Sequence, residues 1–191
     1  DILKISLMKE SVGSQLYVYS REQIAAPSNR RLRLDESCPI FDRSTLVGHK
    51  THNYMEAIHL MGLARNRGDY DILRVDSKGH LAETTSANIF FVKEGHIYTP
   101  ALETGILPGV TRTALLSDKD LEIKSGLYTP KTLLDAEAVF VTNASSGVQL
   151  IEQLYGLPNQ ETVHFSTDAP TISIVQSAFT SIRADHATKL I

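Results

Sequence analysis

Three residues of types that can act together in amine chemistry follow one another along this sequence. Lys50 stands just ahead of an amphipathic segment, Tyr54 follows four residues later, and Glu83 lies in a strand-like run further on. A lysine amine can form a Schiff base with an aldehyde when it is partly desolvated. A phenol can hydrogen-bond a ring oxygen, and a carboxylate can keep a pyridine nitrogen protonated, which makes the ring an electron sink.

Each of the three residues also has a simpler interpretation. Most lysines are solvated surface groups, so Lys50 taken alone favours an exposed position near the start of a helix. Tyr54 could equally be a core tyrosine on the apolar stripe of that helix, and Glu83 could be an edge-strand glutamate that faces water. Together the three groups could bind and use pyridoxal phosphate, but none of them decides the matter alone.

Two loops could bind an anion. The loop 105–112 (GILPGVTR) leads into a short helix, whose N-terminus offers backbone N–H groups and the hydroxyl of Thr111. The loop 143–147 (NASSG) could add donors from its backbone, from Asn143 and from a serine such as Ser145. The alternatives are an ordinary junction between a loop and a helix, and a simple turn between two strands.

Composition excludes several classes of function. With 191 residues, 42% hydrophobic and 21% charged, the chain is an ordinary globular protein of one large domain, or one domain plus a fragment. A net charge of −3 without a long basic run argues against nucleic-acid binding. The histidines lack metal-ligand spacing, so we expect no metal. No run reaches the roughly 20 apolar residues that span a bilayer, and the single cysteine, Cys38, suits a reducing cytoplasm.

A mixture of strands and short helices must position these groups. The clearest helix spans residues 51–67, where Tyr54, Ile58 and Ala64 share one face and Gly68 is placed to be the C-cap. Apolar and alternating runs predict strands at 4–8, 16–19, 31–34, 71–76, 81–82, 87–92, 96–99, 121–124, 138–142 and 148–152, with further helices near 111–117, from 130, and around 172–182.

Four segments, in this order, resemble the class IV pyridoxal-phosphate enzymes (fold type IV), which include branched-chain and D-amino acid aminotransferases and aminodeoxychorismate lyases. They are HKTHNY at 49–54, AETTSANIFFV at 82–92, TPALETGILPGVTR at 99–112 and AVFVTNASSGV at 138–148. The resemblance covers most of residues 24–183. It implies an α+β fold in which residues 24–191 form the large cofactor-binding domain, a mixed β-sheet pseudo-barrel with surrounding helices. Residues 1–23 would be a remnant of the small N-terminal α/β domain, with a junction near residues 20–30.

The resemblance implies a role for each candidate residue. Lys50 would form the Schiff base with the cofactor, pyridoxal 5′-phosphate, and would move protons at the substrate carbon. Tyr54 would contact the ring oxygen, and Glu83 would pair with the pyridine nitrogen. Val110 and Thr111 would hold the phosphate through backbone N–H groups and the Thr111 hydroxyl.

The chain departs from the family pattern in three places. Family members carry roughly a hundred residues of a small domain before the resembling region, and their phosphate-binding arginine comes from that part. The helix after GILPGVTR is short and runs into charged residues at 118–120. Aminotransferases tend to place a threonine where Ala144 stands, so a phosphate contact could pass to Ser145 or Asn143. Asn88, at the position of the motif's asparagine, would have a supporting role.

Two short patterns favour the lyase branch of the family. TNASSGV places an asparagine after its strand, as the lyases do, and SANIF is closer to their AN pattern than to the GEN of aminotransferases. We therefore predict release of pyruvate from 4-amino-4-deoxychorismate to give 4-aminobenzoate. The alternatives are an aminotransferase that uses branched-chain or D-amino acids with 2-oxoglutarate, and a non-catalytic member. The predicted partners are a small-molecule amino substrate and a second copy in a homodimer, in the cytoplasm, with no nucleic acid or membrane.

Overall fold

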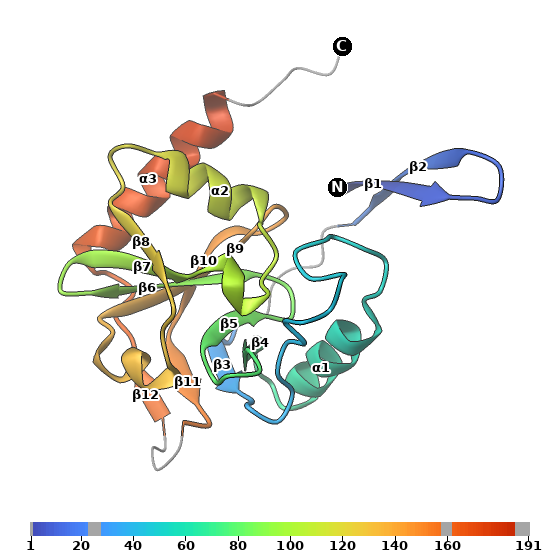
Figure 1. Ribbon diagram of the computed structural model, residues 1–191. Coiled ribbons are helices and arrows are strands. Elements are labelled where there is room, and N and C mark those ends of the chain that lie inside the picture. Colours follow the sequence, from blue (N-terminus) through green and yellow to red (C-terminus); the bar gives the residue numbers. More distant parts are fainter. Residues whose placement is uncertain (1, 23–27, 158–161, 186–191) are drawn as a thin grey trace.

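A ten-stranded mixed sheet forms the centre of the molecule (Figure 1). The computed structural model describes residues 2–22, 28–157 and 162–185. Within these residues three α-helices lie against the sheet, and a separate two-stranded hairpin projects away from it. The strand order is β10-β9-β6-β5-β4-β3-β11-β12, and β7 and β8 extend from β6. The predicted α+β class is confirmed.

Most strands lie within two residues of their predicted positions. The strands of the large sheet are β3 (Arg31–Leu34), β4 (Asp71–Val75), β5 (Leu81–Thr84), β6 (Asn88–Lys93), β7 (His96–Pro100), β8 (Ile123–Gly126), β9 (Ala138–Asn143), β10 (Gly147–Ile151), β11 (Gln153–Tyr155) and β12 (Thr162–His164). The remaining elements are the hairpin strands β1 (Ile2–Lys9) and β2 (Ser14–Arg21), the α-helices α1 (Met55–Asn66), α2 (Val110–Ser117) and α3 (Pro170–Asp185), and the 3-10 turns η1 (Leu102–Thr104) and η2 (Pro130–Asp135). The short strands β11 and β12 were not predicted.

The central strands bury both of their faces. In β6, Phe91 belongs to one apolar cluster, whereas Phe90 belongs to a second cluster that includes residues of α2 and α3. Phe90 stacks on Phe140 of β9 with 4.9 Å between the ring centroids. Because successive side chains of a strand point to opposite faces, this apolar run fills a core on each side of the sheet. Two packed faces hold β5, β6 and β9 firmly in register.

Helix α1 differs from its prediction at its start and in its buried face. It begins at Met55 rather than at residue 51, so Lys50 lies in the loop ahead of it. Leu60 and Ala64 are buried against Ile72 of β4, but Ile58 is 67% exposed. Residues two apart on an α-helix point about 200° from each other, so the face that buries Leu60 turns Ile58 toward solvent. The predicted burial of Ile58 is therefore wrong.

The end of α1 is fixed by its backbone. Arg67 is the C-cap, and Gly68, predicted at that position, comes one residue later with a φ of 75°. The N–H of Asp69 donates to the carbonyl of Ala64 and that of Gly68 to Arg65, each at 3.0 Å. This pairing is a Schellman motif, which turns the chain directly into β4.

The hairpin of β1 and β2 is weakly attached to the rest of the described chain. None of the apolar clusters found in the described residues includes a hairpin residue, and Leu7 and Val12 are 68% and 91% exposed. The hydroxyl of Ser6 contacts Nε2 of His52 at 3.0 Å, which joins the hairpin to the loop after Lys50. The predicted junction near 20–30 falls partly on residues 23–27, outside the described residues. None of the described helices is long and apolar enough to cross a membrane.

Candidate functional site

The carboxylate of Glu83 is held on β5 by two hydrogen bonds. Glu83 is paired with Asn88 of β6 in the sheet register, and Nδ2 of Asn88 donates to Oε2 of Glu83 at 2.8 Å. The backbone N–H of Leu107 donates to Oε1 at 3.2 Å. Leu107 belongs to the loop that leads into α2. The acid is therefore fixed between the sheet and that loop.

Burial raises the pKa of Glu83 to about 7, because the charged form loses its hydration. The N–H of Leu107 acts in the opposite direction, as do the positive charges of Arg74, Lys50 and Arg112. This balance leaves the carboxyl close to half-ionised at neutral pH. A protonated ring nitrogen placed beside it would favour the carboxylate.

Lys50 and Tyr54 meet at the start of α1. Lys50 is exposed, and its Nζ lies 5.3 Å from the centroid of the Tyr54 ring, whose residue is the N-cap of the helix. Residue 50 precedes the helix, so a shared helix face does not bring the two side chains together. The loop brings the two side chains together instead, and the charge of Lys50 reaches Glu83.

The N-terminus of α2 lies next to Glu83. Gly109 is the N-cap, Val110 is 71% exposed and Thr111 is buried. The first N–H groups of an α-helix have no partner within the helix, and they carry the positive end of its dipole. The predicted anion site therefore has its donors at the end of the loop that binds Glu83.

The loop 143–147 is shaped by Asn143. Its Oδ1 accepts from the backbone N–H of Ser145 at 3.0 Å and of Ser146 at 2.7 Å, and from the Ser145 hydroxyl. Its Nδ2 donates to the carbonyl of Ser86 at 3.3 Å, in the turn between β5 and β6. Asn143 thus fixes this loop beside the turn that follows Glu83. The predicted phosphate contacts of Asn143 and Ser145 stay predictions.

Sequence reasoning missed two buried arginines near Glu83. Arg74 of β4 donates to the carbonyls of Cys38 and Pro39 and to Glu56, and Arg112 of α2 donates to the carbonyl of Pro100 and the hydroxyl of Ser125. They are 7% and 4% exposed. An arginine inside the apolar run DILRV was a signal for the first, since strand interiors rarely hold an unpaired charge. No sequence signal identified the second.

One more polar group lies in the same row of the sheet. Thr142 of β9 is paired with Asn88 in the register and is 1% exposed. Its hydroxyl has no hydrogen-bond partner among the described residues. Buried hydroxyls are normally paired, so an unpaired hydroxyl is unusual in this row of the sheet.

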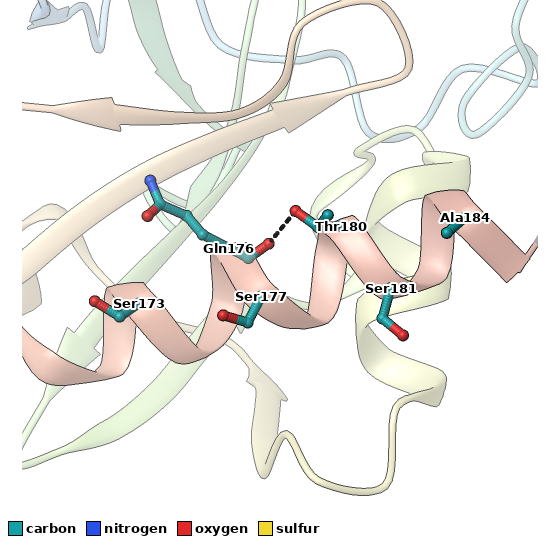
Figure 2. A pocket seen from close by; sticks show the side chains of 6 residues that line it. All are labelled: Ser173, Gln176, Ser177, Thr180, Ser181 and Ala184. Atoms are coloured by element: carbon teal, nitrogen blue, oxygen red, sulfur yellow. Dashed lines mark hydrogen bonds between the residues drawn. The ribbon is translucent and has the colours of Figure 1, made fainter.

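A surface groove lies outside this site. It has a volume of about 590 Å³ and runs along α3 (Figure 2). The residues that line it are Ser173, Gln176, Ser177, Thr180, Ser181 and Ala184. The Thr180 hydroxyl already donates to the carbonyl of Gln176. A groove lined by hydroxyls, an amide and a methyl group offers no acid, base or activated nucleophile, so it is not the candidate site.

The comparisons with known proteins agree on one family. The family profile described as "Amino-transferase class IV" matches residues 6–154. The chain is 31% identical over 126 residues to the mitochondrial branched-chain amino acid aminotransferase 1 of Humulus lupulus, which covers 63% of this chain and 32% of that protein. It is 35% identical over 98 residues to the aminodeoxychorismate lyase of Bacillus subtilis, and this match covers 50% of this chain and 33% of that protein. The matched region spans about a third of the length of these relatives.

Solved structures share the fold. A Legionella pneumophila protein provisionally named 4-amino-4-deoxychorismate lyase superposes with a TM-score of 0.79 at 28% identity, and the match covers 91% of this chain and 65% of that one. The branched-chain amino acid aminotransferase of Thermobaculum terrenum, solved in its PLP form, superposes with a TM-score of 0.74 at 19% identity, covering 90% and 58%. At that lower identity the likeness demonstrates the fold alone.

Proposed function

Because the chain belongs to the class IV aminotransferase family, we propose that it binds pyridoxal 5′-phosphate and releases pyruvate from 4-amino-4-deoxychorismate to give 4-aminobenzoate. The site described above is the one that would carry this reaction. The family match supports the cofactor and the general chemistry. The choice of the lyase reaction rests on two short segments, TNASSGV and SANIF.

The groups present fit this cofactor. A desolvated carboxylate at Glu83 suits a pyridine nitrogen, because the protonated ring would supply the positive charge that burial has made favourable. The N–H groups of Val110 and Thr111 stand in the first turn of α2, where they have no partner within the helix, and they suit a phosphate dianion. The hydroxyl of Thr142, which has no hydrogen-bond partner among the described residues, lies in the same row of the sheet. Lys50 supplies the amine.

Bound pyridoxal phosphate would supply an electron sink for the substrate carbon that bears the amine. Lys50 would hold the cofactor and move the proton at that carbon, and Tyr54 would bind the ring oxygen. Glu83 would keep the ring nitrogen protonated, so that the ring can accept electron density. Loss of the proton and departure of pyruvate leave an aromatic ring in the product.

The observation that carries the lyase proposal is the loop after β9. Asn143 stands there and accepts three hydrogen bonds from its own loop, which sets the shape of residues 143–147. The lyase branch that TNASSGV resembles places an asparagine at this position. The Bacillus subtilis lyase is also 35% identical to the chain over 98 residues.

A transaminase is the second candidate. The chain is 31% identical over 126 residues to the Humulus lupulus aminotransferase, a longer match than that with the lyase. Such an enzyme would use Lys50 for a 1,3-proton shift on a branched-chain or D-amino acid, with 2-oxoglutarate as the acceptor. A non-catalytic family member is the third possibility to test.

One incubation separates these proposals. The protein is mixed with pyridoxal phosphate and 4-amino-4-deoxychorismate, without any keto acid, and both products are measured. The lyase proposal predicts 4-aminobenzoate and pyruvate in equal amounts, and no product from the Lys50→Ala variant. Turnover only when an amino acid and 2-oxoglutarate are present together would instead identify a transaminase. Absence of saturable cofactor binding would favour the non-catalytic member.

We also propose the assembly that the family resemblance implies. Residues 1–23 would belong to a small N-terminal domain and residues 24–191 to the large one, and two copies would associate in the cytoplasm. The separation of the β1–β2 hairpin from the ten-stranded sheet supports the division. Sedimentation velocity tests the dimer, since a monomer at every accessible concentration would contradict it.

A further inference from the structure

The side chain of Asn88 joins two parts of the candidate site. Asn88 is 4% exposed and lies at the start of β6. Its single amide nitrogen makes two hydrogen bonds: one to Oε2 of Glu83 at 2.8 Å and one to the carbonyl of Leu107 at 2.9 Å. Since an amide nitrogen has two hydrogens, both of its donors are used.

Leu107 closes the connection from the other side. Its own N–H donates to Oε1 of Glu83 at 3.2 Å, so Glu83, Asn88 and Leu107 form a closed ring of hydrogen bonds. The carbonyl of Leu107 also accepts from the N–H of Gly109 at 2.8 Å. The acid on the sheet is thereby connected, within three residues, to the N-cap of α2.

Gly109 rests directly on the Asn88 carboxamide. A Cβ atom at position 109 would lie 2.2 Å from Oδ1 of Asn88, far inside van der Waals contact. The backbone of Gly109 has φ −61° and ψ 139°, which any residue adopts. The glycine is therefore required by the space next to Asn88 and not by backbone conformation.

Few other side chains could make this connection. Aspartate has no donor when ionised and would place a second negative charge beside Glu83, and serine has only one donor. Glutamine carries the same group on a longer arm, which the close contact with Gly109 would exclude. The environment of position 88 selects a short carboxamide.

We propose that Asn88 is a positioning residue that fixes the Glu83 carboxylate relative to the loop 107–109. It thereby keeps a constant distance between Glu83, which would pair with the ring nitrogen, and the N-terminus of α2, which would bind the phosphate. This inference rests on the cofactor site proposed above. Asn88 itself would touch neither the ring nor the phosphate. It acts through Glu83 and through the backbone at the start of α2.

The first test needs no cofactor. The carboxyl of Glu83 is followed by carbon-13 NMR as a function of pH in the cofactor-free chain. Asn88→Ala removes a donor to the charged form and should raise the pKa of Glu83 by about one pH unit. Thr99→Val is the matched control: it deletes a buried hydrogen bond from β7 to the carbonyl of Ile89, next to Asn88, without touching Glu83. That variant should leave the titration unchanged.

The second test changes the same ring of hydrogen bonds from the side of the loop. Gly109→Ala should displace the Asn88 carboxamide and shift the Glu83 titration in the same direction as Asn88→Ala. Each variant should weaken pyridoxal phosphate binding by roughly tenfold, and the double variant should be no weaker than either. Non-additivity of this kind is expected only if both changes break one network.

The outcomes separate this inference from the proposed function. An unchanged Glu83 titration in Asn88→Ala, or additive losses of cofactor affinity, would overturn the positioning role while leaving the cofactor site intact. If the Glu83 titration shifts as predicted but the wild-type chain binds no pyridoxal phosphate, the proposed function fails and the hydrogen-bond ring stands. If Asn88→Ala fails to fold, the Gly109→Ala titration alone decides, since a Glu83 pKa equal to wild type would then refute the proposal.

Discussion

Glu83 is an acid whose environment opposes its charge. Burial outweighs the N–H of Leu107 and three neighbouring cations, so the pKa rises from the ordinary 4.5 to about 7. A site built only for stability would not retain such a group, because a buried apolar residue would cost less. Perturbed acids of this kind are concentrated at functional sites.

The raised pKa gives a prediction for stability. The folded state binds the Glu83 proton more tightly than the unfolded state, so its contribution is full below about pH 4.5 and is lost as the pH rises through about 7. Glu83→Gln removes this dependence. Across that window the wild type should lose about 3 kcal/mol of unfolding free energy more than the variant does. Urea unfolding at several pH values measures this, and parallel curves for the two proteins would contradict it.

The types and order of the site residues were readable from the sequence, but their surroundings were not. The order of these three residues, Lys50, Tyr54 and Glu83, relative to the loops 105–112 and 143–147 indicated a cofactor site. The burial of Arg74 and Arg112 depends on contacts with residues from other parts of the sequence. Arg112, for example, contacts Pro100 and Ser125. Local sequence patterns do not predict such contacts. The ring through Asn88 was invisible for the same reason.

At the scale of elements, strands were predicted better than helix ends. The hairpin of β6 and β7 was predicted closely, because two apolar runs flank a short polar turn. The predicted helix begins four residues before α1 does, because the apolar spacing starts before the backbone becomes helical. The three-residue strands β11 and β12 lack the length for a pattern to emerge.

A glycine inside α1 and a glycine just after its C-cap should respond oppositely to alanine. Gly62 lies inside the helix with open space around its Cα, so Gly62→Ala should stabilise the protein by about 0.5–1 kcal/mol. Gly68 also has open space, but its φ of 75° is left-handed, so Gly68→Ala should destabilise by about 1–2 kcal/mol. Chemical unfolding of both variants measures this. Equal effects of the same sign would show that the helix end is not where the structure places it.

The β1–β2 hairpin stands apart from the core. Isolated two-stranded hairpins are marginal in water, and this one exposes apolar residues such as Ile5 and Leu16 at 62% and 60%. Deletion of residues 1–22 should therefore move the thermal midpoint of the remainder by less than about 3 °C, while it lowers the binding of an apolar dye. A large drop of the midpoint would mean that the hairpin is part of the folding unit.

We propose that Lys50 holds pyridoxal phosphate at the site bounded by Glu83 and the start of α2. The most direct measurement is to titrate the cofactor into the protein, reduce the complex with borohydride and map the labelled peptide by mass spectrometry. We predict saturable labelling of Lys50, which is lost in Lys50→Ala and kept in Lys78→Ala, a variant of an exposed lysine in a turn. Labelling spread over other lysines, or equal labelling of the two variants, would contradict this role of Lys50.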